Sequence, residues 1–187
     1  QKERIFRAAG LVSVLTGLAA LVFLLHTIVG NGWGAFTQSY IQLPLKLDAQ
    51  VLRIDNPLDE EEWDYANYAG VIKASLRERF PEVTSRKQKR ILYRLVSPGA
   101  SFQVKQLLDD RSLLDSEVTL WLPADDDVDS LIKGYINREL PEKERRVKDF
   151  ALTLIDDLVS SCQLERKFNL IFFSGGDSSE PEPAAIS

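Results

Sequence analysis

The chain of 187 residues contains one cysteine, one histidine and no methionine. One cysteine cannot form an internal disulfide, and one histidine with one cysteine cannot supply the usual zinc ligands or a histidine-dependent nucleophilic triad. We therefore expect no catalytic residue, no metal site, no cofactor site and no enzymatic activity. The lack of methionine, together with the start at Gln1, leads us to expect a piece of a longer reading frame.

Basic residues are outnumbered by acidic ones, which gives the chain a formal net charge of -5. Nucleic-acid binding requires lysine and arginine gathered on one face, so we expect no nucleic-acid partner. Apolar residues make up 44% of the sequence, and they are concentrated in one long block near the start. This uneven distribution argues against a purely soluble protein.

That block runs without a formal charge from Ala8 to Val29. As a helix rising about 1.5 Å per residue it reaches roughly 33 Å, which matches a hydrocarbon core of about 30 Å. Basic residues lie among residues 1–7 before the block, whereas residues 30–45 carry no charge. The positive-inside rule therefore predicts a cytoplasmic N-terminus, a transmembrane helix at 8–29 and the rest of the chain outside.

A cleaved secretory signal is the competing interpretation, although its apolar run is usually only about 7 to 15 residues long. A second feature of the block bears on partners. Gly10, Ser13 and Gly17 recur at helical spacing and form a smooth strip that suits close approach of another helix. Small residues are also common in any membrane helix, so both interpretations of the strip stay open.

We expect the α+β class, with one transmembrane helix followed by a mixed, helix-rich external domain that contains a small sheet. The predicted segments are a cytoplasmic N-terminus (1–7), the transmembrane helix (8–29), an interfacial linker with an edge strand (30–47), the external domain (48–167) and a connector toward a further membrane helix (168–187).

Two segments show the period of a strand. Apolar residues alternate with others from Ile41 to Leu47, and Pro44 predicts an edge strand because proline donates no backbone hydrogen bond. From Glu117 to Leu122 the alternation is that of a half-buried strand.

Three longer helices are expected. The first begins at the Asn56–Pro57 pair and ends before Pro81, and its acidic first turn suits the helix dipole. The second extends over 85–96. The third runs from about 141 to 162 with a continuous apolar face, and Cys162 at its end is expected to be buried and inert.

Three polar groupings suggest sites, and each has a simpler explanation. Alternating acids within 125–129 resemble a calcium loop, but Ser130 stands where the turn glycine is required and Ile136 where the bidentate glutamate is. Capping of a short helix through Ile136 by Asp126 or Asp127 explains these acids better.

Arginines at 86, 90 and 94 line one face of the second helix. This stripe suits an anion, but a solvated helix face near many acidic residues is the preferred interpretation. Glu61 and Asp64 form an acidic pair of the kind that shares acid and base duties in hydrolases. We expect them instead to solvate the start of a helix.

Three stretches carry a resemblance to a known family: GWGAFTQSYIQL (32–43), VTLWLPADDDVDSLIKG (118–134) and FNLIFFSGGDSSEPEPAAI (168–186). Together they resemble the N-terminal part of a bacterial phosphate ABC transporter permease of the PstA type, in the branch with an external domain after its first membrane helix. Ser179 and Pro183 depart from the residues that the family usually has there.

The resemblance implies the N-terminal part of a permease subunit of an ATP-driven phosphate importer in the bacterial inner membrane, with the domain in the periplasm. The implied partners are a second permease subunit, cytoplasmic ATPase subunits and an external phosphate-binding protein. Because an acidic domain repels phosphate, we expect this domain to pack or dock rather than to bind substrate.

The alternative is a bitopic membrane sensor or adaptor whose external domain binds a protein or peptide. The residues that follow the chain would discriminate: further spans and an ATPase-coupling loop favour the permease, and a cytoplasmic signalling module favours the sensor.

Overall fold

The computed structural model of the chain describes residues 2–168, with side chains except at positions 2, 4, 5, 8, 9, 31–33 and 35. The predicted connector lies outside the described residues apart from Phe168. The chain divides into two compact units, one made of residues 1–37 with 168–187 and one made of residues 38–167.

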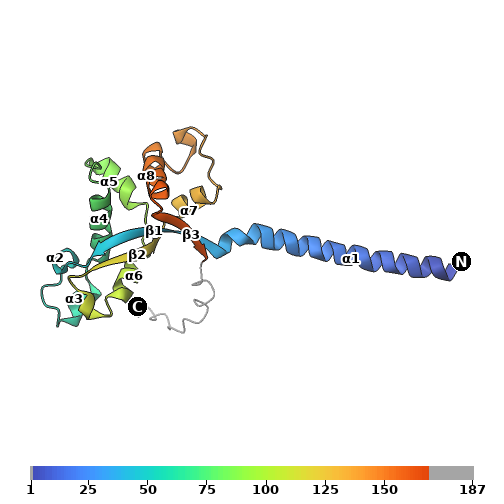
Figure 1. Cartoon of the computed structure of the whole chain (residues 1–187), viewed down its shortest axis with the longest axis horizontal. Helices are drawn as coiled ribbons and strands as arrows, with labels where there is room; N and C mark the ends of the chain where they lie inside the picture. Colours follow the sequence, from blue (N-terminus) through green and yellow to red (C-terminus); the bar gives the residue numbers. More distant parts are fainter. Residues whose placement is uncertain (1, 169–187) are drawn as a thin grey trace, which may run out of the picture. The chain divides into compact units, whose positions relative to one another are not determined.

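The first unit contains the long helix α1 (Lys2–Gly32) and the 3-10 turn η1 (Trp33–Phe36) (Figure 1). The predicted helix at 8–29 is confirmed, and it continues at both ends. Every side chain from Gly10 to Gly30 is exposed. After the helix, the ring of Phe36 stacks on that of Phe168 with centroids 6.3 Å apart.

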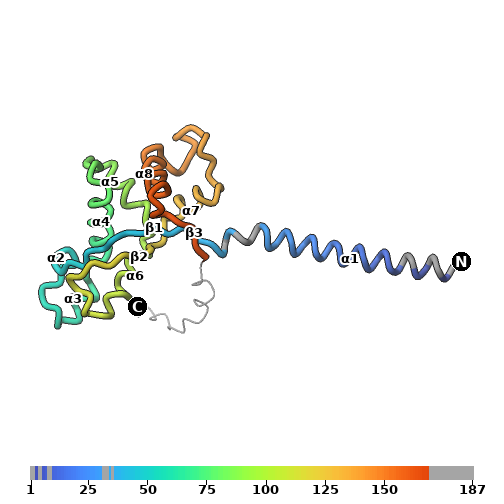
Figure 2. Tube along the Cα trace, viewed as in Figure 1, coloured from blue at the N-terminus to red at the C-terminus, as the bar shows by residue number. Residues whose placement is uncertain are grey.

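The second unit is built on a three-stranded sheet with the order β2-β1-β3. Its strands are β1 (Thr37–Lys46), β2 (Glu117–Pro123) and β3 (Leu164–Phe168). Figure 2 shows β1 crossing the middle of this unit. β1 pairs antiparallel with β2, with Leu43 opposite Leu120. The predicted strand at 117–122 is thereby confirmed.

The prediction that the segment around Pro44 forms an edge strand is wrong, because β1 is the central strand. Backbone groups of Ser39 and Leu47 bond toward the β2 side, whereas the N–H of Gln42 donates to the carbonyl of Gln163 at the start of β3. Alternate residues of a strand form backbone hydrogen bonds to opposite neighbours. Pro44 is two residues from Gln42, so its backbone faces the β3 side, and its missing N–H does not interrupt the hydrogen bonds between β1 and β2.

β3 covers only part of β1. Because Phe168 stacks on Phe36, β3 runs back along the first half of β1. The position where Pro44 would donate therefore lies past the start of β3, and the carbonyl of Pro44 accepts from the Ser75 hydroxyl at 2.6 Å. A proline is tolerated in this central strand because no strand needs its missing donor.

One face of β1, together with Leu47 just after it, supplies the centre of the core: Ile41, Leu43, Leu45 and Leu47 are fully buried. Short helices surround the sheet, and the alternation of β1 positions them around one apolar layer. In chain order they are α2 (Ala49–Leu52), α3 (Glu60–Asp64), α4 (Tyr68–Arg79), α5 (Arg86–Tyr93), α6 (Ala100–Leu107), η2 (Arg111–Leu113), α7 (Asp126–Ile132), η3 (Glu142–Glu144) and α8 (Asp149–Ser160). The α+β class is confirmed.

The first predicted soluble helix is two helices, α3 and α4. The backbone N–H of Asn67 leaves the helical path and donates to the carbonyl of Leu52, while its side chain accepts from the N–H of Gly70. An asparagine that bonds its own neighbourhood in this way starts a new helix rather than continuing the old one. The end before Pro81 is confirmed, since Phe80 is the C-cap.

The last predicted helix is also shorter than expected, because α8 begins at Asp149 rather than near 141. Arg145 and Lys148 have extended backbones, and the buried Val147 between them packs into the core. The helix ends in a Schellman arrangement: the N–H of Cys162 donates to the carbonyl of Val159, and that of Gln163 to the carbonyl of Leu158.

Cys162 is exposed, so the expectation of a buried thiol is wrong. The residue has a φ of 56°, and this left-handed turn after α8 carries its side chain into solvent. The second predicted helix, 85–96, is α5 with Ser85 as its N-cap, but it ends earlier, at Tyr93.

Candidate functional site

Among residues 2–168, α1 is the one helix long and apolar enough to cross a membrane, over Gly10–Gly30. Its large side chains are exposed, as for Phe23 at 72%. The hydroxyl of Thr16 donates to the carbonyl of Val12 at 2.8 Å, and that of Thr27 to Phe23 at 2.9 Å. These polar groups are therefore satisfied within the helix, as a segment in lipid requires. A signal sequence near an N-terminus meets the same criterion of length and composition.

The small-residue strip on α1 leaves open space around its glycines. A Cβ atom built on Gly10 or on Gly17 would meet no described atom within 4 Å. The strip therefore has the smooth surface that close helix approach requires, and the partner helix stays a prediction.

Asp125, Asp127 and Asp129 each make a structural contact. Asp125 is the N-cap of α7 and accepts from the N–H of Asp127, which corrects the expected cap at Asp126 or Asp127. The Asp127 carboxylate pairs with Arg146 at 3.3 Å. α7 ends at Ile132 instead of Ile136, close to Gly134 with its φ of 79°. Within the described part of the chain no cluster of metal-ligating side chains occurs.

Asp129 holds the start of the central strand. Its Oδ1 accepts from the backbone N–H of Ser39 at 2.8 Å, and its Oδ2 lies 2.5 Å from Lys133 Nζ. The side chains of Lys133 and Asp129 are only 10% and 16% exposed. Burial, and then the charge of Asp129, raise the pKa of Tyr40 above its usual value. The cluster joins β1 to α7.

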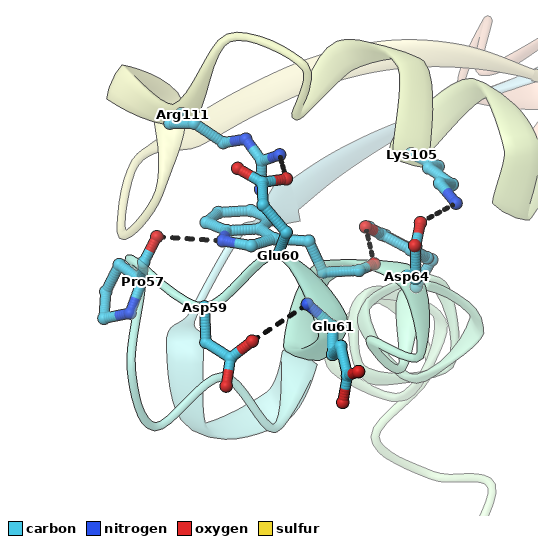
Figure 3. A network of polar contacts seen from close by, with 9 residues as sticks. Pro57, Asp59, Glu60, Glu61, Asp64, Lys105 and Arg111 are labelled. Carbon is cyan, nitrogen blue, oxygen red and sulfur yellow. Dashed lines mark hydrogen bonds and ion pairs between the residues drawn. The ribbon is translucent and has the colours of Figure 1, made fainter.

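The acidic start of α3 belongs to a structural network rather than to an acid–base pair (Figure 3). The Arg111 guanidinium lies 4.0 Å from the centroid of the Trp63 ring and pairs with Glu60 at 2.8 Å. Asp64 pairs with Lys105 at 3.0 Å, and this hydrogen bond raises the pKa of Lys105. Asp64 is paired with a lysine, and the backbone N–H of Glu61 donates to the Asp59 cap at 3.0 Å, so both residues have a place in the start of α3.

The indole of Trp63 anchors this network in the core. Its Nε1 donates to the carbonyl of Pro57 at 3.0 Å, and the residue is 3% exposed. The Tyr68 hydroxyl donates to the carbonyl of Trp63 at 2.5 Å. Burial raises the pKa of Tyr68.

The basic stripe on α5 is solvated as expected, but among the residues that the structure describes it forms no ion pairs with the acidic residues expected beside it. Its three arginines, Arg86, Arg90 and Arg94, are exposed, so the solvated helix face is confirmed. The nearby carboxylates do not neutralise it, since the described ion pairs include none of these arginines. Sequence reasoning identified the stripe, but the distribution of counter-ions depends on the tertiary structure.

The described chain is thus an α+β domain that follows one helix able to cross a membrane. Residues 1–142 match the family described as a domain of unknown function, DUF3333, and the chain belongs to that family. No curated protein matches the chain, and no solved structure does.

Proposed function

We propose that the chain is the N-terminal part of a membrane permease subunit of an ATP-driven phosphate importer, with α1 as a membrane anchor and residues 38–167 as a periplasmic packing or docking domain. The proposed partners are a second permease subunit, cytoplasmic ATPase subunits and an external phosphate-binding protein. The resemblance described above suggests the substrate and these partners.

One structural observation carries the proposal: two of the family-like segments are directly joined where the chain enters the second unit. Ser39 belongs to the segment 32–43, and its carbonyl accepts from the N–H of Ala124 in the segment 118–134 at 2.9 Å. Asp129 of the second segment bonds the Ser39 N–H in turn. The two segments are far apart in sequence, both resemble the same family, and they are in contact in the fold. This supports the proposal that the chain has the architecture of that family.

The charge of the chain supports docking over substrate binding. The net charge is -5, and a negative field opposes the approach of phosphate, although salt screens it beyond a Debye length of about 8 Å. We expect titration of the chain with inorganic phosphate to show no saturable binding in the micromolar range. Micromolar affinity would contradict this part of the proposal.

Transport is tested in the host cell. Deletion of the reading frame that encodes the chain should lower uptake of radiolabelled phosphate at limiting concentration, and the wild-type frame should restore it. Uptake that is unchanged by the deletion, in cells without another high-affinity importer, would contradict a role in phosphate import.

Orientation is tested separately with Asp126→Cys in a Cys162→Ser background. A membrane-impermeant thiol reagent should label this variant in cells whose inner membrane is intact, whereas Glu3→Cys should be labelled only after that membrane is opened. The reverse pattern would show that the domain is cytoplasmic.

A further inference from the structure

Helix α5 concentrates basic side chains that have no counter-ion among residues 2–168. Ten of the fifteen other basic residues of the second unit form ion pairs, from Lys46 with Glu78 to Lys167 with Glu165. The unpaired group on α5 and its C-cap is Arg86, Lys87, Lys89, Arg90 and Arg94. An acidic domain therefore carries five unpaired basic side chains on one helix and its C-cap.

The arrangement of these charges opposes the helix that carries them. Arg86, Arg90 and Arg94 follow one another at the spacing of four residues, where like charges repel. The first turn of α5 contains no acidic residue, so Arg86 and Lys87 stand at the positive end of the helix dipole. The helix forms despite this because Ser85 caps it and Leu92 is fully buried. Folding alone gives no reason to keep these charges together, whereas an external anionic surface does.

The positive surface ends on the side of α8. There Lys148 and Arg146 line hollows together with Lys87 and Arg94, but they pair with Glu142 and Asp127. On this side of the domain the unpaired basic charge therefore lies on α5.

The chemistry of the face favours lipid headgroups over a protein. The large hydrophobic side chains that the second unit exposes lie on other elements, among them Tyr65 and Phe102, so the face lacks the apolar or aromatic centre of a stable protein interface. Clusters of lysine and arginine on the surface of a membrane-anchored protein attract anionic lipids without such a centre. Leu92 of α5 is fully buried in the core, so it is not available for insertion into a bilayer.

We propose that the exposed face of α5 binds the anionic phospholipid headgroups of the bilayer that holds α1. This inference rests on the membrane anchoring proposed above. Because α1 would tether the domain to the bilayer, the effective concentration of headgroups available to α5 would be high. The contact would fix the domain against the bilayer by charge alone, so salt should release it.

The test uses the whole chain in lipid nanodiscs that carry a nitroxide-headgroup lipid. A fluorophore is placed at Thr84→Cys, an exposed position next to the start of α5, in a Cys162→Ser background. Tyr65→Cys, 87% exposed after α3, is the matched control label. In Figure 1, α3 and α5 lie at opposite ends of the second unit. Discs of phosphatidylcholine alone are compared with discs of equal parts phosphatidylcholine and phosphatidylglycerol.

We expect quenching at position 84 to rise at least twofold in the discs with phosphatidylglycerol, with no such rise at position 65. Arg86→Gln with Arg90→Gln should abolish the rise, as should high salt. Arg53→Asn with Arg166→Gln removes the same charge elsewhere and should leave the rise intact. Asparagine suits position 53 because Arg53 has a φ of 64°.

Equal quenching in both kinds of disc would overturn the proposal. Relief of quenching by inorganic phosphate, beyond that by sodium chloride of equal ionic strength, would assign the face to free phosphate and overturn it too. Binding of polyglutamate to the face without any dependence on lipid would favour an acidic protein instead. Failure of the chain to enter nanodiscs would contradict membrane anchoring by α1. A chain that enters the discs but shows equal quenching in both kinds would contradict headgroup binding by α5 alone, so the two proposals can fail separately.

Discussion

The backbone N–H of Ser39 donates to the Asp129 carboxylate at 2.8 Å, which joins the first residues of the central strand to α7. The two residues are far apart in sequence, and the same carboxylate forms a largely buried ion pair with Lys133. The position of β1 in the domain therefore depends on a helix that follows β2.

Asp129→Asn should destabilise the domain by about 3 kcal/mol, because it leaves the Lys133 ammonium buried without its partner. The asparagine oxygen can still accept from Ser39, so the substitution isolates the ion pair. Urea unfolding followed by circular dichroism measures the change.

Asp156→Asn is the matched control, since the Asp156 pair with Arg138 is about half exposed on both sides. Its cost should be below about 1 kcal/mol. Equal losses for the two variants would show that burial of the Asp129 pair is unimportant.

Gly70→Ala should cost about 1 kcal/mol, the usual contribution of an N-cap. A Cβ atom at Gly70 would lie 2.1 Å from Asn67 Nδ2, so the alanine must displace the side chain that caps α4.

Gly99→Ala is the control for this substitution. Its nearest neighbour would be the Ser97 hydroxyl at an ordinary 3.6 Å, and its φ of -63° suits alanine. We expect no loss of stability there. If thermal unfolding showed the two alanine variants to be equally stable, the close packing at Gly70 would be refuted.

Alkaline pH should destabilise the domain through Tyr68. Burial raises the pKa of Tyr68 above the unfolded value of 10.0, so the unfolded chain loses its phenolic proton first. The stability contributed by this group is present below a pH of about 10 and is lost as the pH rises through the folded pKa.

The free energy of urea unfolding, measured across this range, should fall more steeply in the wild type than in Tyr68→Phe. Tyr65→Phe serves as the control, because Tyr65 is 87% exposed. An alkaline loss that Tyr68→Phe does not change would rule out this assignment.

Cys162 should react with a maleimide in the folded protein, because its side chain is exposed in the left-handed turn after α8. Mass spectrometry of the native chain should show one adduct within the time that a free peptide thiol requires. Protection until denaturant is added would contradict the exposed position.

Local patterns predicted those elements whose signals lie within a few residues. The Ser85 cap begins α5, and the alternation from Glu117 defines β2. The apolar segment of α1 is equally local. These signals are sufficient because capping, periodicity and charge act between near neighbours.

The central position of β1 was not predictable in the same way, because strand order depends on pairing with distant segments. Leu164–Phe168 contains little apolar alternation, and its assignment as a strand comes from its place beside β1. Likewise, the arginines of α5 were visible in the sequence, but only the folded chain shows that the acids pair elsewhere. The break before α4 needed the bond from Asn67 to Leu52.

Pro44 also bears on aggregation. Beyond the start of β3, the outer edge of β1 would offer free backbone groups to a strand of another molecule. At this position proline has no N–H group that could donate to another strand, and its carbonyl already accepts a hydrogen bond from the Ser75 hydroxyl of α4. Replacement of Pro44 by a residue with an N–H group would therefore open a short stretch of β1 to intermolecular pairing, at the one place where the sheet is incompletely covered by its third strand.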